Sequence, residues 1–142
     1  MAGSAYLTGT IRTWHKGMRE RIKDRMERVA GKTAHAFGAE ITFEFEEGNP
    51  GVVNDPECAE LARKSVVDVL GDSAVTQYEG TLAGEDFAEY QSLVPSVFVF
   101  VGTNNPAVGA DHPQHSCYYT VDESVLAKGS MVTAQWACRE LA

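Results

Sequence analysis

The hydrophobic pattern changes its period at Gly38, and this change limits how the first third of the chain can fold. From about Lys16 to Phe37, apolar residues recur every three or four positions, which predicts an amphipathic helix. Gly38 is a natural end for that helix. Residues 40–46 then alternate strictly between apolar and polar side chains, as a half-buried strand does. With a β-branched and aromatic stretch at 5–13, the sequence predicts a strand, helix, strand unit.

The remainder of the chain is predicted to form a second unit. Gly48-Asn49-Pro50-Gly51 brings together three residue types that interrupt regular structure, so a domain boundary is expected there. Asp55 followed by Pro56 is typical of a helix start. The further elements expected, in chain order, are helices over 55–70 and 85–93, a buried strand over 96–101 and a helix over 122–141. This order of elements predicts an α/β or α+β fold in two small lobes.

Composition limits the class of protein and its compartment. With 142 residues, of which 44% are hydrophobic, the chain is long enough to bury a core. Its longest apolar run, 97–101, is far below the roughly 20 residues that span a bilayer, and no leader for export is recognised. The three cysteines are widely spaced and odd in number, which argues against a disulfide framework. We therefore expect a cytoplasmic location.

The charge pattern bears on the partners. A net charge of −8 disfavours nucleic acid or an anionic membrane as the main partner, because the average surface repels both. Residues 16–32 depart from this average, since they hold seven basic and three acidic side chains. Two interpretations stay open for this segment: a nucleic-acid-binding helix, or an amphipathic helix with a solvated polar face.

His115 is the first candidate for chemistry. It lies in a loop after the predicted strand 96–101, and loops at strand ends often carry ligand-binding residues. A neutral imidazole is a common ligand of zinc or manganese, whereas a lone loop histidine can also have a surface or hydrogen-bonding role. His112, three residues earlier, is a second possible ligand.

Three further charged residues have two interpretations each. Glu85 and Asp86 are adjacent, so on a helix they point about 100° apart and cannot act as a facing pair. They either stabilise the start of the predicted short helix or have a functional role. Arg12 on a strand face either binds a carboxylate through a bidentate pair or is a surface partner of neighbouring acidic residues.

Several segments, in their order and spacing, resemble the aminoacylase and carboxypeptidase superfamily of metallopeptidases. The closest likeness is to its branch of hippurate hydrolases and indoleacetyl-amino-acid hydrolases, and it extends over essentially the whole chain. The matching segments are Leu7-Thr8-Gly9-Thr10-Ile11-Arg12-Thr13, Asn49-Pro50 with Val53-Asn54-Asp55, Gly84-Glu85-Asp86-Phe87 and Gln114-His115-Ser116.

The resemblance implies an architecture. Members of this superfamily have a catalytic α/β domain with two divalent metal ions, interrupted by a smaller lid domain that often dimerises. Residues 1–47 would be the second half of the lid, an α+β remnant. Residues 48–142 would be the C-terminal part of a mixed α/β catalytic domain with a central sheet.

The resemblance also implies roles for single residues. His115 corresponds to the last metal ligand, and Arg12 lies in the lid strand associated with substrate and dimer contacts. Gly84, Glu85 and Asp86 match a motif that lines the active site and are expected to bind substrate.

Two departures from the family pattern limit what this chain does alone. The other metal ligands and the general-base glutamate of the family belong to a part of the sequence that this chain does not have, so no catalytic residue is assigned. Cys117 stands where the family usually has proline after the His-Ser pair. It is expected to be a small buried thiol, with a ligand role as the alternative.

Two hypotheses of different classes follow. The first is a truncated amidohydrolase that cleaves N-acyl amino acids or small peptides, using two zinc or manganese ions when intact, and that is inactive alone with no ion necessarily bound by this chain. The second is a non-catalytic dimerisation or interaction module derived from such an enzyme. A homo-oligomer is also expected, through the edges of the strand at 96–101 or through the lid strand, because a truncated chain exposes surfaces that the missing half would cover. Whether the chain by itself is an enzyme stays open.

Overall fold

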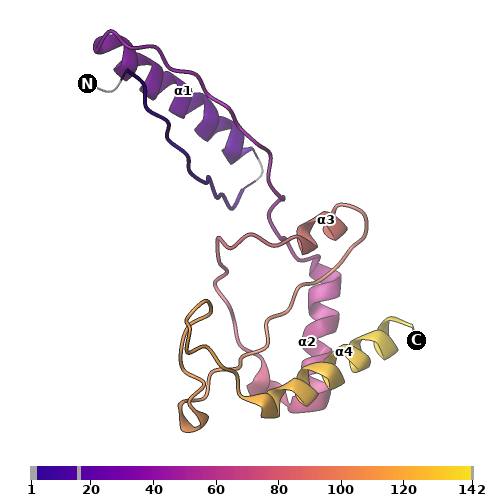
Figure 1. The fold of residues 1–142 in the computed structure, drawn as a ribbon. Helices are drawn as coiled ribbons and strands as arrows, with labels where there is room; N and C mark the ends of the chain where they lie inside the picture. The colour runs from indigo at the N-terminus through magenta and orange to yellow at the C-terminus, as the bar shows by residue number, and fades with distance from the viewer. Residues whose placement is uncertain (1–2, 16, 142) are drawn as a thin grey trace. The chain divides into compact units, whose positions relative to one another are not determined.

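The computed structural model describes residues 3–15 and 17–141 of the chain. Its helices, in chain order, are α1 (Met18–Ala36), α2 (Pro56–Leu70), η1 (Asp72–Ala74), α3 (Phe87–Gln91), η2 (Pro106–Val108), η3 (Glu123–Val125) and α4 (Leu126–Glu140), of which the η elements are single 3-10 turns (Figure 1). The four predicted helices are therefore confirmed, with shorter ends. The expected helix start at Lys16 lies outside the described residues.

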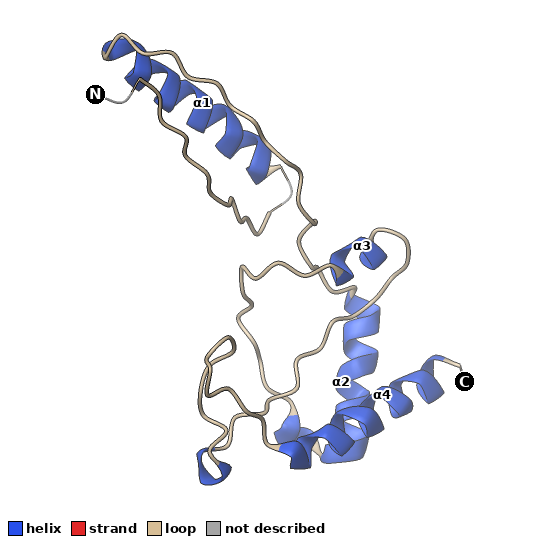
Figure 2. Cartoon of the chain, viewed as in Figure 1, coloured by secondary structure: helices blue, strands red, loops and turns tan. Residues whose placement is uncertain are grey.

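The prediction of an α/β fold with a central sheet is wrong for the described part of the chain. Figure 2 shows helices joined by loops, and neither 3–15 nor 17–141 contains a β-strand. An isolated bridge between Asn105 and Ala110 is the nearest approach to one. The segments 5–13, 40–46 and 96–101 belong to the loops. A strand requires a second backbone at about 4.8 Å in a hydrogen-bonded ladder, and alternation within one segment does not supply that neighbour.

The chain divides into two compact units, which are described separately. Unit 1 comprises Met1–Val52 with Gly80–Glu89, and unit 2 comprises Val53–Glu79 with Tyr90–Ala142. The segment 80–89 thus packs with residues from much earlier in the chain.

In unit 1, the apolar stripe of α1 is covered only in part. None of its residues is buried, and Met26 and Val29 are 41% and 56% exposed. The rings of Phe43 and Phe45 stack with centroids 5.9 Å apart, and the Lys23 ammonium lies 5.4 Å from the centre of the Phe45 ring. The predicted alternation of 40–46 therefore places aromatic rings toward the helix without forming a strand.

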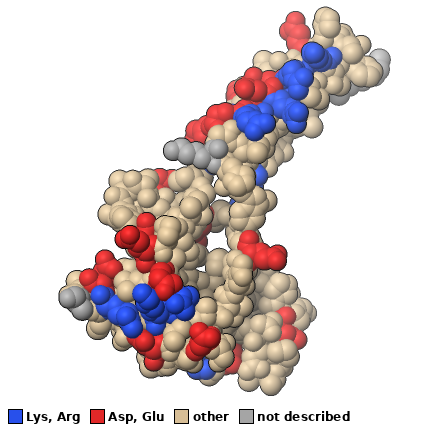
Figure 3. Space-filling view, turned by 180° about the vertical axis from the view of Figure 1, so that it is seen from behind, with Lys and Arg blue, Asp and Glu red and all other residues tan. Residues whose placement is uncertain are grey.

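Arg19, near the start of α1, bonds residues 47–49, which directly follow the segment 40–46. Its guanidinium donates to Glu47 Oε2 at 3.0 Å, to the Gly48 carbonyl at 3.2 Å and to the Asn49 carbonyl at 2.9 Å. Lys23 also pairs with Glu47, and the hydrogen bond from Lys23 is the main cause of a lowered pKa of the Glu47 carboxyl. Figure 3 shows acidic side chains beside the basic ones along the α1 arm. Part of the basic charge of 16–32 is thus balanced locally, which favours the solvated-face interpretation.

In unit 2, α2 starts as its sequence predicts. The Asp55 carboxylate accepts hydrogen bonds from the backbone N–H of Glu57 at 2.9 Å and of Cys58 at 3.0 Å, and Pro56 follows in the first turn. The bond from Cys58 is the main cause of a lowered pKa of Asp55. Gly71, with φ of 86°, ends the helix. The start and end signals of this helix are confirmed.

Helices α2 and α4 pack against each other. The buried residues of α2 are small, Ala62 and Ser65, and the Ser65 hydroxyl donates to the Leu61 carbonyl of its own helix at 2.8 Å. Small side chains let two helix backbones approach closely. Beside this contact, the Asp68 carboxylate accepts hydrogen bonds from Gln135 at 3.0 Å and from Arg139 Nε at 2.8 Å.

Asn54 holds the apolar run 96–101. Its side-chain amide donates to the Phe98 carbonyl at 2.9 Å and accepts from the Phe98 N–H at 2.8 Å. Asp55 N–H adds a bond to the Ser96 carbonyl at 3.1 Å. A carboxamide carries both a donor and an acceptor, so one Asn54 side chain bonds both backbone groups of a single residue as a neighbouring strand would.

Little of the described chain is buried. Of the described residues, only Ala62, Ser65, Ala88 and Ala110 are buried, whereas Leu93, Phe100 and other large apolar side chains are exposed. No described helix is both long and apolar enough to cross a membrane. The two units therefore have small cores and broad apolar surfaces.

The contact between Asp68 and Arg139 predicts a loss of stability in acid. Arg139 lowers the pKa of Asp68 below its ordinary value of 3.8, so the ionised pair stabilises the folded chain above that pH and the stabilisation is lost as pH falls through the lowered pKa. We expect Asp68→Asn to unfold at lower urea concentration than the native chain at neutral pH, with the difference shrinking in strong acid. Urea titrations over a pH series measure this. The losses from Asp68→Asn and Arg139→Gln should not add in the double variant, and full additivity would contradict direct pairing.

Candidate functional site

Arg12 lies in unit 1 with its side chain exposed. Its Nη1 donates to the Leu82 carbonyl at 3.0 Å, across 70 positions of sequence. Among the described residues it forms no ion pair with a carboxylate, so the interpretation as a partner of neighbouring acidic residues finds no support. A guanidinium bonded only to a neutral carbonyl still has several N–H donors for an anion.

Gly84 lies directly beside this guanidinium. A Cβ atom on Gly84 would be 3.1 Å from Arg12 Nη1, closer than ordinary van der Waals contact. The structure thus brings together Arg12 and the first residue of the Gly84-Glu85-Asp86-Phe87 motif.

Glu85 and Asp86 lead into α3. The half-buried Glu85 accepts a hydrogen bond at Oε1 from the Phe87 N–H at 3.2 Å, and the Asp86 carbonyl accepts from the Glu89 N–H at 3.0 Å. The Asp86 side chain is exposed. Glu85 therefore supports the first turn of a short helix, while the Asp86 carboxylate faces solvent.

Trp14 contacts the segment 80–84, which Arg12 also contacts. The sequence did not predict a role for Trp14. A Cβ atom on Gly80 would lie 2.7 Å from Cζ3 and 2.8 Å from Cη2 of the Trp14 ring, and Gly80 has φ of +91°. Only glycine adopts this conformation readily and leaves room for the ring. The sequence carries no signal for this pair, because the two residues are 66 positions apart and neither belongs to a recognised motif.

His115 lies in unit 2, in the loop between η2 and η3. It is exposed and has φ of 67°, an unusual value for a residue other than glycine. The turn is closed by a hydrogen bond from the Ser116 N–H to the Pro113 carbonyl at 3.2 Å. His115 is exposed, and its imidazole has no hydrogen bond or ion pair with the described residues.

His112 differs from His115 in this respect. Its ring centroid lies 5.4 Å from that of Tyr118, and its Nε2 is 4.0 Å from Asp111 Oδ1. Of the two candidate histidines, His115 is the one whose imidazole is unengaged. Cys117 is exposed, so the expectation of a buried thiol at this position was wrong.

The described residues contain no complete metal centre. No group of three or more histidine, cysteine, aspartate or glutamate side chains lies close enough to hold an ion in 3–15 and 17–141. The candidate residues are also divided between the units: Arg12, Gly84, Glu85 and Asp86 belong to unit 1 and His115 to unit 2. These residues therefore supply one exposed imidazole and one exposed guanidinium, but not the ligand set that a zinc or manganese ion requires.

The contacts of Gly80 and Gly84 predict different costs for alanine. Gly80→Ala should destabilise unit 1 by about 1–2 kcal/mol or more, because alanine disfavours positive φ and its methyl group would overlap the Trp14 ring. Gly84→Ala should cost less, since only the flexible end of Arg12 has to move. Denaturant unfolding followed by Trp14 fluorescence in a Trp136→Phe background measures both. Equal losses from the two variants would contradict the contact with Trp14.

Comparison with known proteins identifies the family. The pattern of peptidase family M20/M25/M40 matches residues 3–139. The chain is 32% identical over 136 residues to thermostable carboxypeptidase 1 of Saccharolobus solfataricus, covering 95% of this chain and 34% of that protein. It is also 32% identical over 139 residues to IAA-amino acid hydrolase ILR1-like 6 of Arabidopsis thaliana, covering 95% and 30%.

An uncharacterised hydrolase of Staphylococcus epidermidis is 35% identical over 122 residues, covering 85% of this chain and 32% of that protein. The chain thus spans about a third of the length of these curated relatives. No solved structure matches it significantly. Because the family pattern covers nearly all of the sequence, the chain belongs to peptidase family M20/M25/M40.

Proposed function

We propose that this chain is part of a metal-dependent amidohydrolase that cleaves the amide bond of N-acyl amino acids or small peptides. The observation that carries the proposal is the His115 imidazole, which is exposed and unengaged among the described residues while His112 contacts Tyr118 and Asp111. Membership of a peptidase family, and relatives named carboxypeptidase and IAA-amino acid hydrolase, support the reaction class.

We assign the residues as follows. Residues 1–47 are the second half of the lid domain, and residues 48–142 are the C-terminal part of the catalytic domain. His115 is a metal ligand. The substrate-binding residues are Arg12, Gly84, Glu85 and Asp86.

The metal is zinc or manganese, with two ions in the intact enzyme, and it would polarise the scissile carbonyl and activate water. One imidazole does not hold such an ion by itself, so the other ligands come from outside the described residues. On this proposal the chain alone is inactive. What its own residues contribute is one ligand and the recognition of substrate.

Arg12 is assigned to the carboxylate of the substrate. Its guanidinium is exposed, has no acidic partner among the described residues and is held at one nitrogen by the Leu82 carbonyl. An arginine bonded at one nitrogen still presents further N–H groups to the two oxygens of a carboxylate. N-acyl amino acids and peptides both carry such a group.

The cysteines bear on the compartment. Cys58, Cys117 and Cys138 are all free thiols. Thiols persist in reducing surroundings, so we propose a cytoplasmic location.

Reconstitution tests the proposal. The chain would be combined with the part of thermostable carboxypeptidase 1 that precedes the matching segment, in the presence of Zn²⁺ or Mn²⁺. We expect metal-dependent release of amino acid from an N-acyl amino acid, because the added part supplies the remaining ligands. His115→Ala should lower this rate by about 100-fold or more, since one ligand of a metal that activates water is lost.

His112→Ala is the matched control and should leave the rate nearly unchanged, because His112 has no assigned role. Equal losses from the two histidine variants would contradict the assignment of His115. A mixture that forms a complex but stays inactive would favour the non-catalytic alternative.

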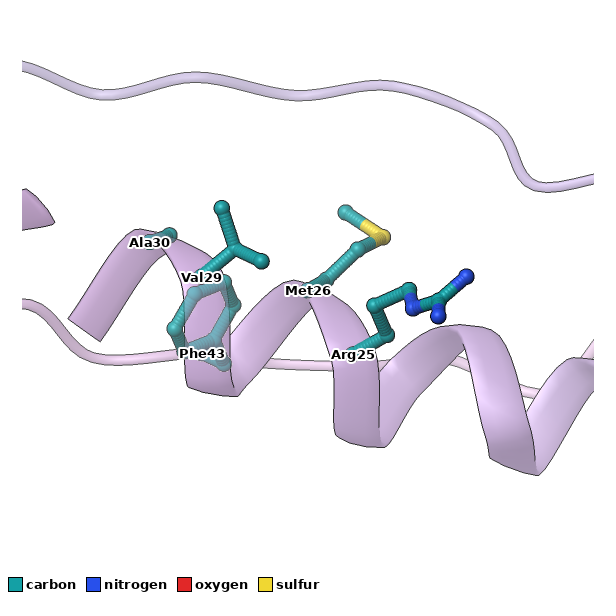
Figure 4. Close-up of a pocket in the computed structure, with 5 residues that line it drawn as sticks. All are labelled: Arg25, Met26, Val29, Ala30 and Phe43. Atoms are coloured by element: carbon teal, nitrogen blue, oxygen red, sulfur yellow. The ribbon is translucent and has the colours of Figure 1, made fainter. Parts of the chain in front are cut away.

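That alternative, a dimerisation or interaction module, is favoured by one observation. A groove of about 320 Å³ on α1 is lined by the side chains shown in Figure 4, namely Arg25, Met26, Val29, Ala30 and Phe43. Its apolar members are only partly covered within unit 1. We therefore propose that the chain is a homo-oligomer, with this groove as a contact.

Replacing an apolar residue of the groove tests the oligomer. Val29→Asp should weaken self-association about tenfold, because it places a charge where an apolar side chain would be buried. Sedimentation velocity over a concentration series measures the change. His35→Asp, an exposed substitution on the same helix, is the control and should have little effect. A native chain that stays monomeric at all concentrations would contradict the oligomer.

A further inference from the structure

Trp14 and Arg12 contact one segment, 80–84, in a regular order. Trp14 packs on Gly80, while Arg12 bonds the Leu82 carbonyl and lies beside Gly84. From Gly80 to Gly84 the residue number rises, while the contacting residue changes from Trp14 back to Arg12. The two segments therefore pass each other in opposite directions and are joined by side chains.

The contact between Trp14 and Gly80 is specific to this pair. Position 80 requires glycine for two independent reasons. Its φ is +91°, and a Cβ atom there would lie 2.7 Å from the Trp14 ring. The Trp14 side chain is 53% exposed, and the Cζ3 and Cη2 edge of its ring is the part that packs on Gly80. A flat ring loses little conformational freedom when one edge packs, so the contact restrains the backbone that carries the ring. Arg12 stands two residues before Trp14 on that backbone.

Arg12 has no comparable anchor of its own. Its single bond to the Leu82 carbonyl is exposed to water, where such bonds exchange readily with solvent. A long side chain held by one exposed hydrogen bond samples many rotamers unless its backbone is fixed nearby.

We propose that Trp14 is a positioning residue: by stacking on Gly80 it holds the Arg12 guanidinium against the 82–84 backbone, where it binds the carboxylate of an N-acyl amino acid. This inference rests on the proposed role of Arg12. It adds the residue that pre-organises the carboxylate site, and pre-organisation strengthens binding by lowering the ordering cost.

The test uses the ¹⁵N-labelled chain and follows the Nε–Hε resonance of Arg12, assigned by its absence in Arg12→Lys. Without ligand, Trp14→Ala should move this resonance toward the position of a freely mobile arginine, and Trp14→Phe should restore it. With N-acetylalanine as probe, the native resonance should titrate, and Trp14→Ala should bind about tenfold more weakly. The methyl ester of N-acetylalanine, which lacks the carboxylate, should not titrate.

Tyr6→Ala is the matched control, since Tyr6 is an aromatic residue of the same N-terminal segment and is 89% exposed. It should change neither the resonance nor the titration. If Trp14→Ala leaves both unchanged, the positioning role is overturned. If Trp14→Ala moves the resonance but the native chain does not titrate with N-acetylalanine, positioning stands and the carboxylate role of Arg12 is overturned.

Discussion

Three side chains, Arg12, Arg19 and Asn54, bond backbone groups far along the chain, and the loops of both units depend on these bonds. Arg19 bonds the carbonyls of residues 48 and 49, Asn54 bonds both backbone groups of Phe98, and Arg12 bonds the carbonyl of Leu82 while Trp14 packs on Gly80. In a sheet, backbone pairing would supply such bonds in series. Here each long loop is held at a few points, so individual side chains determine where it lies.

Several residues of the matched motifs therefore have a structural role in this chain. Asn54 and Asp55, which belong to one of the segments that resemble the metallopeptidase superfamily, hold the apolar run and cap α2. Arg12 and Gly84 belong to two other such segments and lie in contact. His115 differs, because its side chain has no bond to any described residue and its backbone has a positive φ. The contacts of Asn54, Asp55, Arg12 and Gly84 give these four residues a structural role. The His115 side chain has no such contact among the described residues.

The helices were predictable because their signals are local. Asp55, Pro56 and Gly71 mark the two ends of α2, and the cap, the first turn and the stop all depend on residues within a few positions of each other. The apolar spacing of residues 16–37 likewise identified α1. The strands were not predictable in this way. The pattern of 40–46 specifies which side chains share a side, and Phe43 and Phe45 do stack, but a ladder requires a partner backbone that the pattern does not specify.

The sequence by itself determined the family, the four helices and the identity of the candidate residues, since motifs, caps and periodicity are written in short stretches of neighbouring residues. The tertiary structure decided what those residues contact. His112 contacts Tyr118, whereas the His115 side chain contacts no described residue through a hydrogen bond or ion pair. Arg12 bonds a neutral carbonyl and no acidic side chain among the described residues, and Trp14 packs on Gly80. These contacts join positions tens of residues apart or depend on loop conformation. Chain closure over such distances is governed by packing and not by local preference.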